Sequence, residues 1–131
     1  MQFVVFKLGD EQFALNTEKV REINDMMSVT RVPKAPDYII GLINLRGSIK
    51  SLIDLSLLIN FSSSEKKNSI IILKVDEEEV GIAVDDVIEV VDIAETDIQS
   101  LSSHTGESYI RGIINIEDKL VTIIEVDDLL N

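Results

Sequence analysis

The sequence contains no cysteine and no tryptophan, only two prolines and one histidine, and no long apolar run. Without cysteine the chain can form neither a disulfide nor a thiolate metal site, which fits a reducing compartment. No segment approaches the roughly 18 uninterrupted apolar residues that a membrane-spanning helix needs. The first ten residues, which include Lys7, lack a basic start followed by a long apolar core, so we expect no signal peptide. These absences predict a soluble, cytoplasmic protein.

Basic side chains are scarce as well. Twelve lysines and arginines stand against 24 acidic residues, which gives a net charge of −12. Such a chain repels phosphate backbones and anionic lipid surfaces. Four phenylalanines and two tyrosines offer few platforms on which bases could stack. Nucleic acid and direct membrane insertion are therefore excluded from the expected partners.

β-branched residues dominate what is present. The chain has 20 isoleucines and 13 valines among 131 residues, and their stiff side chains favour strands over helices. The apolar runs 3–8 and 12–15 flank a short Gly-Asp turn, and the runs 70–75 and 80–84 flank an acidic turn. Both patterns are typical of a β-hairpin. The sequence predicts a mainly β fold.

The sequence repeats one structural unit. Residues 38–59 return as residues 109–130, an offset of 71, whereas the preceding residues match at an offset of 67. The matched pairs are Tyr38/Tyr109, Ile39/Ile110, Gly41/Gly112, Ile43/Ile114, Asn44/Asn115, Ile53/Ile124 and Leu58/Leu129 at the first offset, and Lys7/Lys74, Glu11/Glu78, Val20/Val87 and Glu22/Glu89 at the second. The difference places four extra residues in 96–108, a polar segment that we expect to be a loop.

The repeat predicts the domain organisation. We interpret residues 1–131 as one domain made of a first copy, 1–61, and a second copy, 69–131, joined by the serine-rich linker 62–68. Each copy supplies four or five short strands and a short helix, too little to bury an apolar face alone. We therefore expect two small antiparallel β-barrels packed together. Whether a strand is exchanged between the barrels stays open at this point.

Positions that recur and positions that diverge have different meanings. Gly41 and Gly112 recur, which indicates a backbone requirement such as a bulge or a close approach. Arg46-Gly47 diverges, because the second copy has Glu117-Asp118 there. An arginine beside a permissive glycine can project a planar set of five donors toward a partner. The alternative is a structural salt bridge with one of the many acids, and the residues alone leave both open.

Catalytic arrangements are not indicated. His104 is flanked by Ser103 and Thr105, but no G-x-S-x-G turn exposes a nucleophile, so we expect a solvent-exposed loop histidine. Asp54 and Glu125 occupy matching places, which invites comparison with paired catalytic carboxylates. Both precede short helical segments, where an acid caps the helix or complements its dipole. We interpret them as structural, and we expect no enzyme.

Metal and cofactor sites are not indicated either. The acidic runs 77–79 and 85–86 lack the D-x-D-x-D-G spacing of a calcium loop, so we expect them to be solvated. The chain has neither a P-loop motif nor G-x-G-x-x-G. The sequence therefore predicts no metal and no cofactor.

Several stretches carry a resemblance to a known family. They lie in register along the chain at residues 20–23, 32–47, 53–55, 80–87 and 109–112. In order and spacing they resemble the CheW family of chemotaxis coupling proteins over essentially the full length. The resemblance implies two five-stranded SH3-like β-barrels with short helices and no enzymatic activity.

The resemblance also implies partners. It indicates an adaptor that couples the cytoplasmic tip of methyl-accepting chemoreceptors to the regulatory domain of the histidine kinase CheA. Such an adaptor is cytoplasmic and is recruited to receptor arrays at the inner face of the membrane. The alternative is a CheW-like regulatory domain of a CheV-type protein or another two-component pathway scaffold.

Site residues follow from the same resemblance, position by position. It implies a receptor- or kinase-binding surface formed by Val20, Glu22, Asn44, Arg46 and Gly47. Apolar residues at barrel ends are candidates for a kinase-facing surface, namely Leu42, Ile43, Val87 and Ile88.

Overall fold

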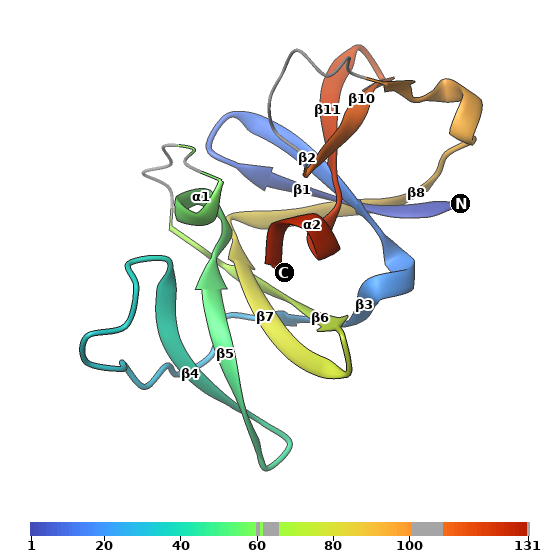
Figure 1. The fold of residues 1–131 in the computed structure, drawn as a ribbon. Helices are drawn as coiled ribbons and strands as arrows, with labels where there is room; N and C mark the ends of the chain where they lie inside the picture. Colours follow the sequence, from blue (N-terminus) through green and yellow to red (C-terminus); the bar gives the residue numbers. More distant parts are fainter. Residues whose placement is uncertain (60, 62–65, 101–108, 131) are drawn as a thin grey trace. The chain divides into compact units, whose positions relative to one another are not determined.

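The computed structural model describes residues 1–59, 61, 66–100 and 109–130 (Figure 1). The described chain is mainly β, with a few short helices, which confirms the predicted fold class. It forms two compact units. Unit 1 comprises Met1–Glu18 with Val87–Asn131, and unit 2 comprises Lys19–Asp86.

The predicted hairpins are confirmed as β1–β2 and β6–β7. The strands are β1 (Gln2–Leu8), β2 (Glu11–Asn16), β3 (Val20–Asp25), β4 (Ile39–Leu45), β5 (Ser48–Asp54), β6 (Ser69–Val75), β7 (Glu78–Val84), β8 (Asp86–Asp92), β9 (Gln99–Ser100), β10 (Ile110–Ile116) and β11 (Lys119–Ile124). The helices are α1 (Leu55–Leu58) and α2 (Val126–Leu130), with 3-10 turns η1 (Thr17–Lys19) and η2 (Glu95–Asp97). The predicted loop 96–108 contains part of η2 and β9, and its remainder, with His104, lies outside the described residues.

Each sheet takes strands from both sequence copies. The sheet of unit 1 has the order β8-β1-β2-β11-β10-β9, and the sheet of unit 2 has the order β3-β6-β7-β5-β4. In both, the hairpin of one copy is inserted among strands of the other. The parallel pairs of the two sheets, β2–β11 and β7–β5, have the same register. Ala14 faces Ile123 in one sheet, and their counterparts in the other copy, Gly81 and Leu52, face each other in the other sheet. The hairpins are thus exchanged between the copies, while the copy boundaries drawn at 61 and 69 stay a prediction.

Each unit has its own apolar core. In unit 1 the buried cluster consists of Phe3, Val5, Ala14, Ile93, Ile114, Val121 and Ile123. In unit 2 it consists of Ile43, Leu45, Leu52, Ile70, Ile72 and Ala83. A fully buried Leu, Ile or Phe contributes about 1.5–3 kcal/mol, so these clusters are the main source of stability. Their β-branched side chains fit the pleated surface of the central strands.

The sheet of unit 2 closes on itself near Gly41. The backbone after β3 reaches β4, where Thr30 N donates to Leu42 O at 2.9 Å and Leu42 N donates to Thr30 O at 2.7 Å. A Cβ atom at Gly41 would lie 2.3 Å from the Thr30 carbonyl oxygen. A register shift between Ile39 and Gly41 marks a bulge at the same place. Glycine is therefore required here by the approach of the closing segment.

The second copy repeats this bulge and close backbone approach in unit 1. There β9 closes the sheet by pairing Gln99 with Ile113 of β10. A Cβ atom at Gly112 would lie 2.5 Å from the Gln99 carbonyl oxygen, and a register shift separates Ile110 from Gly112. The prediction that the recurring glycines mark a bulge or a close approach is confirmed, and both conditions hold at each.

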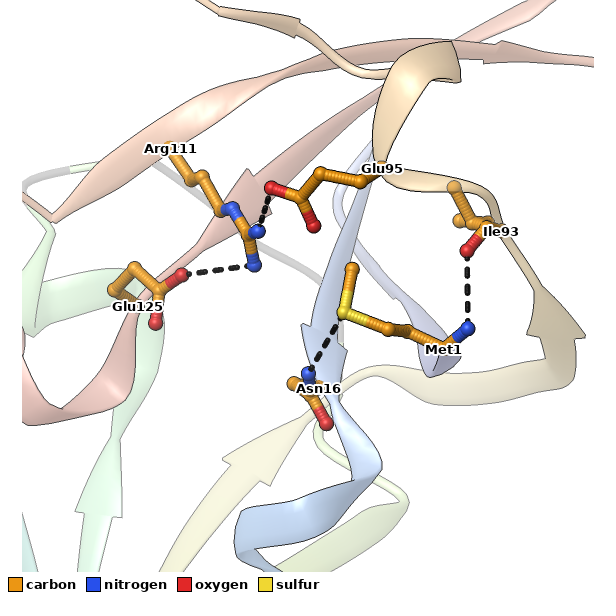
Figure 2. A network of polar contacts seen from close by, with 6 residues as sticks. All are labelled: Met1, Asn16, Ile93, Glu95, Arg111 and Glu125. Carbon is orange, nitrogen blue, oxygen red and sulfur yellow. Dashed lines mark hydrogen bonds and ion pairs between the residues drawn. The ribbon is translucent and has the colours of Figure 1, made fainter.

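Asp54 caps the short helix that ends the first copy. Its Oδ1 accepts hydrogen bonds from Ser56 N at 3.0 Å and from Ser56 Oγ at 2.5 Å. The interpretation of Asp54 as a structural acid is confirmed. Glu125, its counterpart, has a different structural partner, since Glu125 Oε1 accepts from Arg111 Nη1 at 3.3 Å (Figure 2).

Candidate partner-binding site

The candidate site is built on the tight turn between β4 and β5. Arg46 and Gly47 both have positive φ angles, 52° and 86°. Two positive φ angles are typical of a type I′ hairpin turn, which suits the twist of the flanking strands. In the second copy Glu117 and Asp118 have φ angles of 50° and 68°. The two copies thus share the turn and differ in the side chains that it presents.

Asn44 holds this turn in place. Its side-chain Oδ1 accepts a hydrogen bond from Gly47 N at 2.9 Å. In the second copy the Oδ1 of Asn115 accepts from Asp118 N at 3.0 Å. This shared contact gives the physical reason why the asparagine recurs while the turn residues change.

Arg46 forms an ion pair with Glu22. Its Nη1 donates a hydrogen bond to Glu22 Oε1. Glu22 lies on β3, at the opposite end of the strand order from β4, so the pair forms because the sheet closes. The Arg46 side chain keeps 63% of its surface exposed, against 28% for Glu22. The structural salt bridge that the sequence left open is therefore present, and it leaves the guanidinium accessible.

The pair favours the cationic form of Arg46. The hydrogen bond from Arg46 to the Glu22 carboxylate raises the pKa of the guanidinium above its usual value, and the charges of Glu22 and Glu79 add to that effect against slight desolvation. Because the pKa of Arg46 is higher in the folded chain than in the unfolded chain, the ion pair makes its full contribution to stability at any pH below the unfolded-state pKa. That contribution is lost only as the pH rises through the folded-state pKa. Arg46 thus stays cationic throughout the physiological range. Exposed pairs contribute little to stability, so the bond mainly orients the side chain.

Val20 lies beside Glu22 at a bulge. On β3, Val20 faces Leu73 and Glu22 faces Ile72, so the register shifts between them. Bulges re-aim neighbouring side chains, and this one accompanies the turn of Glu22 toward Arg46. Val20 is half-buried. The structure thus places Val20, Glu22, Asn44, Arg46 and Gly47 within unit 2. Hydrogen bonds join Arg46 to Glu22 and Gly47 to Asn44.

The four apolar candidates differ in accessibility. Ile43 is only 1% exposed and belongs to the core of unit 2, so its side chain is not available to a partner. Sequence alone could not separate it from Leu42, its half-buried neighbour on the other face of β4. Val87 is half-buried and Ile88 is 42% exposed.

One polar network was not predicted from the sequence. Arg111 bonds Glu95 through Nη2 and Glu125 through Nη1 in unit 1 (Figure 2). The hydrogen bond to Glu95 is the main cause that raises the pKa of Arg111 above its usual value. The signal in the sequence was a divergence, because Arg111 stands where the first copy has Ile40. Figure 2 also shows the amine of Met1, which donates to the carbonyl oxygen of Ile93 at 3.2 Å.

The expectation of a solvated acid is wrong for Asp85. This residue is 2% exposed, and its carboxylate pairs with Lys67 Nζ at 3.0 Å. A buried charge requires such a partner. Asp86, Glu77 and Glu78 are exposed, as expected.

Two negative findings apply to the part of the chain that the structure describes. No helix there is long and apolar enough to cross a membrane. Across the same ranges no group of three or more histidine, cysteine or acidic side chains is arranged to hold a metal ion.

Comparison with known proteins decides the family. The model of the CheW-like domain matches residues 2–131. The chain belongs to the CheW-like domain family. The chemotaxis protein CheW of Rhizobium meliloti is 32% identical over 98% of this chain and 86% of its own length. The CheW protein of Helicobacter pylori is 34% identical over 99% of this chain and 81% of its own length.

A solved structure agrees with this assignment. The scaffolding protein TtCheW of Thermoanaerobacter tengcongensis is 33% identical and superposes with a TM-score of 0.90, over 99% of this chain and 87% of its own. Chemotaxis protein CheV3 of Helicobacter pylori is a weaker match, 30% identical over 91% of this chain but only 41% of its own length. The chain is thus a CheW-type chemotaxis coupling adaptor, and the CheV-type alternative has less support.

Proposed function

We propose that this chain joins chemoreceptors to the histidine kinase CheA in the cytoplasm and catalyses no reaction itself. Its membership of the CheW-like domain family and its likeness to a scaffolding protein support this role. The single observation that carries the site assignment is the exposed guanidinium of Arg46, oriented by Glu22.

The receptor- or kinase-binding surface consists of Val20, Glu22, Asn44, Arg46 and Gly47. Arginine is enriched at interfaces because its planar donors recognise carboxylates and carbonyls in a fixed geometry. Here Glu22 holds that plane before any partner arrives, which reduces the rotamer entropy lost on binding. The type I′ turn adds rigidity, since Asn44 fastens the Gly47 amide.

The accessible members of the apolar set are candidates for a kinase-facing surface, each within its own unit. Leu42 in unit 2, and Val87 and Ile88 in unit 1, retain exposed side-chain surface, whereas Ile43 is withdrawn because it lies in the core. An adaptor must form and rearrange both contacts during signalling, so moderate affinities are expected. Many copies in an array then supply avidity through effective concentration.

The test is Arg46→Ala with Glu117→Ala as its matched control. Both variants truncate the first residue of a type I′ turn, one in each copy. We expect Arg46→Ala to weaken co-sedimentation with receptor-containing membranes or with CheA roughly thirtyfold, as for an interfacial hot spot, while its melting temperature stays near wild type. Glu117→Ala should retain wild-type affinity.

Two outcomes would contradict the proposal. Wild-type affinity of Arg46→Ala for both partners discards the site assignment. Failure of the wild-type chain to join receptor and CheA in one complex, or to alter CheA autophosphorylation, discards the adaptor role.

A further inference from the structure

Unit 2 contains another ion pair, between Lys50 on β5 and Glu79 on β7. The Lys50 Nζ lies 3.6 Å from the Glu79 Oε1, and β5 and β7 are neighbours in the sheet. The two side chains are 24% and 27% exposed, far less than the 63% of Arg46. Solvent therefore screens this pair less than it screens the guanidinium of Arg46.

The register of the sheet places both partners on its core-facing side. In the β4–β5 pair Lys50 is opposite Ile43, which belongs to the core of unit 2. Glu79 stands two residues before Gly81 on β7, and a Cβ atom at Gly81 would contact core side chains. Because residues two apart share a face of a strand, Glu79 also lies on the core side. The pair thus lies over the edge of the apolar core.

Glu79 acts on the same guanidinium as Glu22. Glu22 is on the core side of β3, since it is opposite the fully buried Ile72. The raised pKa of Arg46 is due first to the hydrogen bond and the charge of Glu22, and the charge of Glu79 adds to it. Arg46 hydrogen-bonds Glu22. Two carboxylates therefore attract one guanidinium, and one of them holds it.

The other copy provides a comparison within the molecule. The positions in unit 1 that correspond to Glu22, Arg46, Lys50 and Glu79 are Glu89, Glu117, Val121 and Gln12. Val121 is opposite Gln12 across the parallel pair of β11 and β2, so the strands meet as β5 and β7 do. Neither residue carries a charge. The Lys50–Glu79 pair thus accompanies the turn that carries an arginine and has no counterpart at the turn that carries Glu117.

A second lysine is near Glu79 but has another partner. Lys74 is opposite Glu79 in the antiparallel pair of β6 and β7. Its Nζ lies 3.7 Å from Glu77 Oε2, on a side chain that is 92% exposed. The ion pair of Glu79 is therefore formed with Lys50, and Lys74 provides a control of equal charge in the same sheet.

We propose that Lys50 is a positioning residue for the candidate site, because its pairing with Glu79 keeps that carboxylate from competing with Glu22 for Arg46. This inference rests on the proposed function and adds to it a residue that acts through Arg46. Ion pairs near a surface differ little in strength, so an unpaired Glu79 would take a share of the guanidinium. The apparent affinity for a partner falls in proportion to the fraction of Arg46 that stays in the binding orientation.

The experiment compares four variants of the full chain with wild type. Lys50→Met removes the charge with a side chain of similar length that suits the edge of an apolar core. Lys50→Arg keeps the charge, and Lys50→Met/Glu79→Gln removes the competing acid as well. Lys74→Met is the matched control. Dissociation constants are measured for receptor-containing membranes and for CheA, and thermal melts verify that each variant is folded.

A spectroscopic readout follows the guanidinium directly. The chain has four arginines, so the Nε–Hε resonance of Arg46 in a proton–nitrogen NMR spectrum is identified by its absence from Arg46→Ala. A change of partner from Glu22 to Glu79 moves this resonance. A general loss of stability does not move it in a folded chain.

We expect Lys50→Met to raise the dissociation constant about two- to fivefold for the partner whose binding Arg46→Ala weakens, since equal sharing between two acids halves the competent fraction. Its Arg46 resonance should move. Lys50→Arg and Lys74→Met should match wild type in both measurements. The double variant Lys50→Met/Glu79→Gln should regain wild-type affinity, because no competing acid remains.

The failures are distinguishable. Wild-type binding by Lys50→Met, an equal loss in Lys74→Met, or a double variant as weak as Lys50→Met overturns the role of Lys50. If Arg46→Ala still weakens binding in the same assay, the candidate site and the adaptor role stand. Absence of binding between the wild-type chain and both partners defeats the proposed function itself.

Discussion

Replacing Gly41 by alanine tests how the sheet of unit 2 closes. An added Cβ atom would lie 2.3 Å from the Thr30 carbonyl oxygen and 2.7 Å from Val29 Cγ1. An ordinary contact is 3.4–4 Å, so the closing backbone must retreat by about 1 Å. That retreat breaks the bridge between Thr30 and Leu42, whose two hydrogen bonds measure 2.9 and 2.7 Å.

The magnitude follows from these losses. Each backbone hydrogen bond contributes about 0.5–1.5 kcal/mol net. Overpacking a close contact costs about 1–3 kcal/mol. Together the free energy of unfolding should fall by about 3 kcal/mol, which corresponds to a drop of about 10 °C in melting temperature for a chain of this size.

The measurement is thermal or urea unfolding followed by circular dichroism, with Gly47→Ala as the control. Gly47 has a φ of +86°, but a Cβ atom there meets nothing within 4 Å. The stability of Gly47→Ala should therefore fall only by the torsional cost of placing an alanine in the left-handed region, about 1 kcal/mol. Gly112→Ala, whose Cβ would lie 2.5 Å from Gln99 O, should behave like Gly41→Ala. A Gly41→Ala protein that melts like wild type, or at no lower a temperature than Gly47→Ala, would refute the closure argument.

Two further substitutions test the turn and the helix cap. Asn44→Ala and Asn115→Ala should each lower the free energy of unfolding by about 1 kcal/mol, because each removes one side-chain hydrogen bond to a turn amide. Only Asn44→Ala should also weaken partner binding. Equal binding by both variants would show that the Asn44 turn does not position Arg46. Asp54→Ala should lower the free energy of unfolding, measured in urea, by about 1 kcal/mol because the N-cap of α1 is lost. Asp54→Asn should recover most of this loss. An Asp54→Ala protein as stable as wild type would show that the cap is dispensable.

Much of the fold was predictable from the sequence because the hairpins are local. The β6–β7 pair needs only a β-branched run, an acidic turn and a second run, and its register follows from Ile71 facing Ile82. The recurrence of Gly41 and Gly112 indicated a backbone constraint, although not which segment imposed it. The closing partners, Thr30 and Gln99, have no distinctive residue type that would reveal them.

The exchange of hairpins was not predictable for a physical reason. Both copies have nearly the same apolar pattern, so β1–β2 would fit beside the strands of either copy. The burial of individual residues could not be predicted from the sequence either. Ile43 and Ile88 are both isoleucines in apolar runs, yet one is 1% and the other 42% exposed. Asp85 looked like part of a solvated acidic pair, but it is buried and forms an ion pair with Lys67.

The candidate site was predictable only in part. Arg46 drew attention because the second copy has Glu117 at that position, and the structure gives both residues the same turn geometry. The contact with Glu22 depends on closure of the sheet, which joins the two ends of the strand order and has no signature in sequence spacing.

Hairpin exchange limits where the two copies can diverge. In unit 2 the β6–β7 hairpin lies between β3 and β5, so the strands of the first copy alone would leave β3 without its neighbour. The same holds for β1–β2 between β8 and β11 in unit 1. Because β1, β2 and β11 in unit 1 and β5, β6 and β7 in unit 2 each have neighbours from both copies, a change there disturbs two sets of contacts at once. Turn tips escape this constraint, since Arg46 and Gly47 are both exposed. The sites proposed for partner binding therefore lie where a duplicated β fold has the most freedom to change.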